Sequence, residues 1–100
     1  MSDSPEENAV RAIYKEMQRI RAQVPGSRWY FFGSIVGTKS PVKDIDLLVV
    51  CETTCDCTTV RAELTSVCVV LPIHLLIMTL REELEVNFIQ GERAIEISSD

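Results

Sequence analysis

The sequence predicts a small α/β fold in which helices cover one mixed or parallel sheet. Three observations lead to this class. Segments with helical periodicity alternate with short apolar segments, one apolar segment is long enough to be a strand buried on both faces, and 100 residues suffice for one hydrophobic core. We therefore expect a single domain over residues 1–100.

The first helix should begin near Pro5, with Ser4 and Glu7 spaced as a capping box. A Pro-Gly-Ser turn at residues 25–27 should end it. Between these limits six apolar residues recur at helical spacing and predict the buried face: Val10, Ile13, Tyr14, Met17, Ile20 and Val24.

Two strands follow. Residues 28–32 form the first, and residues 44–51 form the second, which reads as buried on both faces from Leu47 onward. The acidic start of this second strand, at Asp44 and Asp46, is its unusual feature.

The remaining residues predict a helix over 56–68, with Val60, Leu64 and Val67 facing inward, and a third strand over 72–78. A last helix over 79–90 should begin with a capping box formed by Thr79 and Glu82. Residues 94–97 form either a short last strand or a loose tail.

The composition excludes several classes of protein. The net charge of -5 argues against non-specific attraction to nucleic acid or to an anionic membrane, so direct nucleic-acid binding is not expected. No apolar run is long enough to span a bilayer. The acidic, polar start MSDSPEENA is unlike a secretory signal, so we expect a cytoplasmic protein.

Four cysteines leave two interpretations open. Cys51, Cys55 and Cys57 form C-x-x-x-C-x-C, with Cys68 eleven residues further on. This spacing is not that of a zinc ribbon or finger, and we favour free thiols, as a reducing compartment implies, over a zinc site.

The two acids of the second strand admit a plain interpretation and a functional one. Strand alternation places Asp44 and Asp46 on one face, roughly 7 Å apart along the chain, where their charges repel. They could simply form a solvated strand start. Alternatively, a divalent cation such as Mg²⁺ or Mn²⁺ would relieve the repulsion and suit the oxygen ligands, and such ions usually act on phosphates.

Gly33-Ser34 lies at the end of the first strand, just before these acids. Free backbone N–H groups at a turn there can bind an anion, and glycine lets a phosphate approach closely. The Ser34 hydroxyl adds a donor. Gly-Ser at a strand end, followed nine residues later by Asp-x-Asp at the start of the next strand, is a narrow pattern.

The segments FFGSIVG and SPVKDIDLLVV, with the element order around them, resemble the nucleotidyltransferase superfamily related to DNA polymerase β, in particular its minimal nucleotidyltransferase members. The resemblance covers residues 28–78. It implies that Gly33 and Ser34 hold the phosphates of ATP or another NTP. It also implies that Asp44 and Asp46 bind Mg²⁺ or Mn²⁺ and that a nucleoside monophosphate passes to a hydroxyl.

The sequence departs from that family at two places. Ile35 and Val36 stand where a basic residue is frequent, so Lys39 and Lys43 become candidate phosphate ligands, although both also read as ordinary loop lysines. The third strand, PIHLLIM, has no acid where the family carries its third carboxylate.

His74 occupies the place of that missing carboxylate. A helical crossover to a parallel third strand aligns the strand starts, so we expect His74 beside Asp44 and Asp46. By contrast, Asp56, Glu82 and Glu83 should lie at the far end of the strands. His74 reads as a general base, as a ligand for a softer cation such as Mn²⁺, or as a structural residue of a site without catalysis.

Two functions follow from different classes. One is a nucleotidyltransferase that modifies a protein or a small molecule, with Asp44, Asp46 and His74 catalytic. The other is a catalytically degenerate nucleotide-binding or interaction module, such as an antitoxin-like partner. Either needs a homodimer or a partner chain to complete its cleft, and the resemblance implies a HEPN-domain partner.

Overall fold

The computed structural model describes residues 5–33 and 44–97. Its elements in chain order are α1 (Pro5–Gln23), β1 (Arg28–Phe32), β2 (Ile45–Cys51), α3 (Thr54–Val70), β3 (Ile73–Thr79), α4 (Leu80–Val86), α5 (Phe88–Gly91) and β4 (Ile95–Glu96). The α/β class and the order of helices and strands that the sequence predicts are confirmed.

The four strands form one mixed sheet in the order β3-β2-β1-β4. β1 runs antiparallel to both β2 and β4, whereas β2 and β3 are parallel and joined through α3. This crossover is the connection that a parallel neighbour requires. The central strand β2 is the most buried: Leu47, Leu48 and Val49 have no exposed surface.

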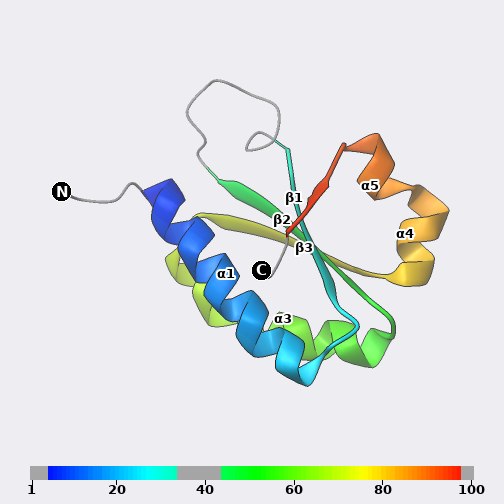
Figure 1. Ribbon diagram of the computed structural model, residues 1–100, viewed down its shortest axis with the longest axis horizontal. Coiled ribbons are helices and arrows are strands. Elements are labelled where there is room, and N and C mark those ends of the chain that lie inside the picture. The colour runs from blue at the N-terminus through cyan, green and yellow to red at the C-terminus, as the bar shows by residue number, and fades with distance from the viewer. Residues whose placement is uncertain (1–4, 34–43, 98–100) are drawn as a thin grey trace.

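Helices cover both faces of the sheet (Figure 1). α1 and α3 lie on one face, and α4 and α5 on the other. Alternation along β2 divides its side chains between two cores. Leu47 and Val49 pack with α1 and α3, whereas Leu48 and Val50 pack with residues that include Phe88 of α5. The predicted burial of β2 on both faces is confirmed.

A buried polar network connects α1 to β1. The Ser27 hydroxyl donates to the carbonyl oxygen of Val24 at 2.8 Å and accepts from the Trp29 indole N–H at 3.0 Å. Both side-chain polar groups are therefore satisfied within the core, as buried polar atoms require. The network ends the helix and fixes the start of β1, the strand that leads to Gly33.

Three local predictions differ from the structure. β2 begins at Ile45, so Asp44 is an exposed residue in a bend before the strand. Tyr14, predicted on the buried face of the first helix, is 39% exposed. The predicted helix over 79–90 is interrupted at Asn87, whose φ of 53° is left-handed and ends α4.

Other local predictions hold. Thr79 caps α4 through a reciprocal capping box with Glu82, and residues 95–96 form the short last strand. Val60 and Leu64 of α3 are buried, with Val67 packed against the same core. The predicted capping box at Ser4 lies outside the described residues. Among those that are described, no helix has the length and apolar character needed to cross a bilayer.

Candidate functional site

One end of the sheet brings together residues from three strands. Because β1 is antiparallel to β2 and β2 is parallel to β3, the end of β1 meets the starts of β2 and β3. In the register, Phe32 lies opposite Asp46, and Asp46 lies opposite His74. The predicted alignment of the strand starts is confirmed for Asp46 and His74.

Asp46 and His74 interact directly across β2 and β3. The Nδ1 atom of His74 lies 3.1 Å from Oδ1 of Asp46. The Asp46 side chain is 22% exposed, whereas that of His74 is 71% exposed. Since Leu48 and Leu76 follow two residues later on their strands and pack in the core beneath α5, both polar side chains point to that face of the sheet.

Gly33 follows β1 directly and touches the same carboxylate. Its φ is +71°, a conformation that side-chain-bearing residues rarely adopt. A Cβ atom at this position would overlap Oδ2 of Asp46 and lie 3.0 Å from the Asp46 carboxyl carbon. Glycine therefore suits this position for two reasons: the backbone angle, and the Asp46 carboxylate, which would have to move to make room for a side chain.

The remaining predicted site residues are placed less fully. Asp44 lies two residues before Asp46 and is exposed. Ser34, Lys39 and Lys43 lie outside the described residues, so the predicted turn after Gly33 and the two lysine ligands stay predictions. The geometry thus joins Gly33, Asp46 and His74, with Asp44 next to them in the chain.

The other acids lie at the opposite end of the strands, as predicted. Asp56 belongs to the first turn of α3, which follows the end of β2. Glu82 and Glu83 belong to α4, which follows the end of β3. Their carboxylates have local roles: Glu82 accepts from the Thr79 backbone N–H at 2.8 Å, and buried Glu83 accepts from the Ile89 N–H at 2.9 Å.

Within the described ranges, no three His, Cys, Asp or Glu side chains come close enough to hold one metal ion. Cavities of about 250 and 520 Å³ are lined by Cys51 and by Thr79, respectively, and so lie at the far end of the strands from Asp46. The site residues therefore supply at most a pair of carboxylates and an imidazole, and neither cavity belongs to them.

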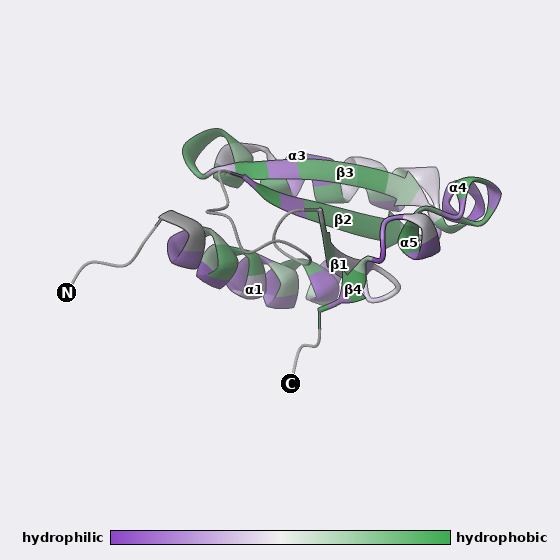
Figure 2. Cartoon of the chain, turned by 90° about the horizontal axis from the view of Figure 1, so that it is seen from above, coloured by the Kyte–Doolittle hydropathy of each residue, from purple (hydrophilic) through white to green (hydrophobic). Residues whose placement is uncertain are grey.

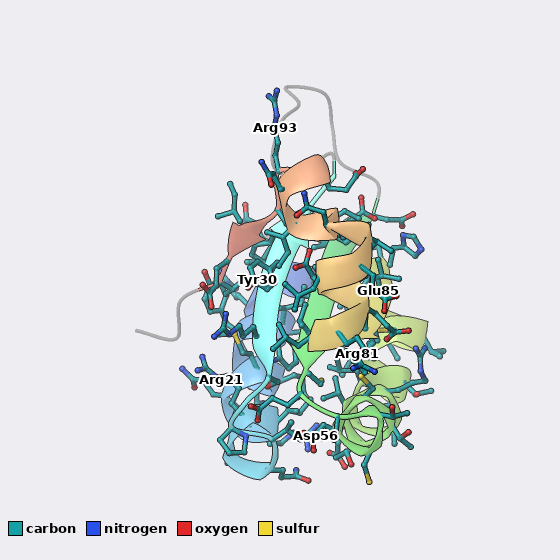
Figure 3. All side chains as sticks on the ribbon, turned by 90° about the vertical axis from the view of Figure 1, so that its right-hand side faces the viewer. Arg21, Tyr30, Asp56, Arg81, Glu85 and Arg93 are labelled. Atoms are coloured by element: carbon teal, nitrogen blue, oxygen red, sulfur yellow. The ribbon has the colours of Figure 1, made fainter. Side chains whose placement is uncertain are left out.

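Arg93 is a residue that sequence reasoning missed. Ile95 of β4 pairs with Phe31, so the chain enters β4 past the end of β1, where Gly33 lies. Arg93 is exposed and has a positive φ of 54°. Figure 3 shows Arg93 and Asp56 at opposite ends of the molecule. The sequence shows Arg93 only as a basic residue just before a short strand. That pattern does not predict that the short strand pairs with β1.

The cysteines are not among the residues that meet at Asp46: Cys51, Cys55 and Cys57 lie at or beyond the far end of β2, and Cys68 packs against the core on the α3 face of the sheet. All four are free thiols. Burial, followed by the neighbouring Cys57, raises the pKa of Cys51 to about 12, and burial also raises the pKa of Cys57 and Cys68. A raised pKa keeps a thiol protonated and poorly nucleophilic, so these three do not resemble reactive cysteines.

Comparisons with known proteins bear on the fold. No family model and no curated protein matches the chain. A solved structure described as "Crystal structure of putative nucleotidyltransferase" is similar, with a TM-score of 0.60 and 20% sequence identity over 84% of this chain and 96% of that chain. At this identity the likeness concerns the fold alone. The mixed four-stranded sheet and its covering helices are therefore a nucleotidyltransferase-like fold.

Proposed function

We propose that this chain is a nucleotidyltransferase-like domain that binds an NTP, such as ATP, with a divalent cation and transfers a nucleoside monophosphate to a hydroxyl acceptor. The observation that carries the proposal is the convergence of Gly33, Asp46 and His74 at one end of a nucleotidyltransferase-like sheet. We place the protein in the cytoplasm, where NTP and Mg²⁺ are available.

Asp44 and Asp46 are the residues proposed to hold Mg²⁺ or Mn²⁺. Carboxylate oxygens suit both ions, and the exposure of Asp44 leaves its carboxylate accessible. A bound divalent cation would neutralise phosphate charge and act as a Lewis acid. We also propose that the chain is of the minimal nucleotidyltransferase type.

The phosphate side of the site is proposed to lie at Gly33. The Asp46 carboxylate fills the space that a side chain at Gly33 would take, so the phosphates are proposed to bind beyond Gly33 in the chain. Ser34, Lys39 and Lys43 follow there in the sequence as donors. Arg93 adds a cation from the segment before β4, at the same end of β1. It is a candidate for the basic group that Ile35 and Val36 do not provide.

His74 is proposed to take the proton of the incoming hydroxyl. If Nδ1–H donates to Asp46, then Nε2 carries the lone pair and can accept a proton. Asp46 would hold the ring in this tautomer, as carboxylates do for other catalytic histidines. The high exposure of the imidazole leaves it accessible to an acceptor.

One observation favours a second candidate function. In the described part of the chain the third carboxylate is missing, and no three-ligand metal cluster forms. A catalytically degenerate module that binds nucleotide or a partner protein, for example one of HEPN type, is therefore the alternative.

The test is a thermal-shift titration with ATP and Mg²⁺ or Mn²⁺. The chain should be stabilised by mass action, and Asp44→Asn with Asp46→Asn should abolish that shift without unfolding the protein. Glu85→Gln, an exposed substitution on α4, is the matched control and should respond as the parent does. A double variant that responds fully would refute the proposed site.

Turnover is measured separately with α-labelled ATP and candidate acceptor proteins. Label transferred to an acceptor, with release of pyrophosphate, supports the enzyme. Nucleotide binding without transfer supports the module.

A further inference from the structure

β3 lies at an edge of the sheet, and its outer side is unpaired within residues 5–33 and 44–97. It pairs with β2 alone, in parallel, over all seven residues from Ile73 to Thr79. Figure 2 shows this edge position and the apolar character of most of the strand. An unpaired edge presents a row of free N–H and C=O groups that can pair with another strand.

The features that usually block such pairing are missing from β3. Protected edges are short, charged, bulged or interrupted by proline. The sequence IHLLIMT contains no Lys, Arg, Asp, Glu or Pro, and its register with β2 is continuous. The opposite edge differs, because β4 has only two residues and one of them is Glu96. Among the strands of the described residues, β3 therefore offers the edge that is better suited to strand addition.

The side chains of β3 are also less buried than those of its neighbour. Leu75, Leu76 and Ile77 are only half-buried, whereas Leu47, Leu48 and Val49, opposite them on β2, have no exposed surface. The two strands are equally long and similarly apolar. The greater exposure of the β3 side chains therefore leaves apolar surface that a further strand beside β3 would cover.

We propose that the outer edge of β3 pairs antiparallel with β3 of a second copy of this chain, about a two-fold axis perpendicular to the sheet. Antiparallel self-pairing is closed and self-complementary, so it produces a dimer and not a fibre. The proposal depends on the edge alone and not on nucleotide chemistry.

The sequence of β3 suits this register. Directly opposed residues of an antiparallel pair point to the same face, so a two-fold axis perpendicular to the sheet must lie midway between one residue and the same residue of the partner strand. Leu76 is the middle of the seven residues. Centred there, Leu76 faces the partner's Leu76 and Leu75 faces the partner's Ile77. His74 then faces the partner's Met78. No like charges oppose each other, and the central pairs are aliphatic.

This arrangement also bears on the proposed site. His74 belongs to β3, so a second copy would stand beside the imidazole and form a further wall of the proposed site. The acceptor would then enter between two subunits.

The first test is sedimentation equilibrium of the full chain without nucleotide. We expect a mass twice the 11.3 kDa of the chain at micromolar concentration. Leu76→Lys places two ammonium groups opposite each other at the axis and should give a monomer. Leu84→Lys is the control, because Leu84 lies on α4 and is already 71% exposed, and it should remain dimeric.

A second test reads the register and does not depend on the lysine variant folding. In a Cys55→Ser background, Leu76→Cys should form a disulfide-linked dimer with oxidised glutathione, because opposed residues lie within disulfide range. Leu75→Cys, whose opposed residue is Ile77, should cross-link far less. A parent that is monomeric at every concentration overturns the proposal. So does a dimer in which both cysteine variants cross-link equally or neither does.

Discussion

Replacement of Gly33 by alanine is the sharpest probe of the site, because the structure gives two separate penalties. At a φ of +71° a Cβ costs about 1–2 kcal/mol in the backbone. The same Cβ would overlap Oδ2 of Asp46, so the carboxylate has to move and its contact with His74 through Oδ1 is disturbed. That displacement adds about 1–2 kcal/mol. Gly33→Ala should therefore lower the free energy of unfolding by about 2–4 kcal/mol.

Urea unfolding of the parent, the two single variants Gly33→Ala and Asp46→Ala and their combination separates the two penalties. In an Asp46→Ala background the carboxylate is gone, so Gly33→Ala should cost only the backbone contribution, about 1–2 kcal/mol. Gly91→Ala is the matched control, since no atom lies within 4 Å of its Cβ position and no positive φ is recorded there. It should change stability by less than about 1 kcal/mol. Equal costs of Gly33→Ala in the parent and in the Asp46→Ala background would refute the close approach of Asp46.

Further predictions concern catalysis, pH and helix capping. If the chain turns over ATP, His74→Ala should remove most of the rate in the α-labelled assay while nucleotide affinity stays within a few-fold. If the chain does not turn over ATP, His74→Asp should create metal-dependent transfer. An active parent whose rate is indifferent to both substitutions contradicts the role of His74 as general base. The pKa of Cys51 is about 12 against an ordinary 9.0, so the native thiol keeps a proton that the unfolded thiol loses, and stability should fall as pH rises from 9 to 12. Cys51→Ala should flatten that fall in urea titrations, and an unchanged slope would contradict the assignment. Thr79→Ala should lower the free energy of unfolding by about 1 kcal/mol because it removes the α4 cap, whereas Thr65→Ala, at an exposed position of α3, should not lower it. Equal urea midpoints of the two variants would count against the cap.

The core of the fold was predictable because its signals are local. The apolar run of β2, the length of the segment from Val50 to Ile73 and the rule that parallel strands need a crossover together place His74 beside Asp46. The position of Gly33 at the strand end was also predictable. Its close contact with Asp46 was not, since that contact depends on the register of β1 against β2.

What sequence reasoning missed depends on long-range contacts or on unusual backbone angles. Asn87 ends α4 in the left-handed conformation without a glycine to mark it. Tyr14 lies at the margin of an apolar helical face, where periodicity alone does not distinguish buried from exposed positions. Arg93 reaches the site end only because β4 pairs with β1 from the far end of the chain.

The central position of β2 has a consequence for the motions of the site. Strands held on both sides and on both faces open only when the whole domain unfolds, whereas an edge strand can detach by itself at lower free energy. Asp46 is carried by the former kind of strand and His74 by the latter. In the monomeric chain, backbone amide hydrogens of β2 should therefore exchange with deuterium more slowly than those of β3, so that the carboxylate serves as a fixed point against which the imidazole can move.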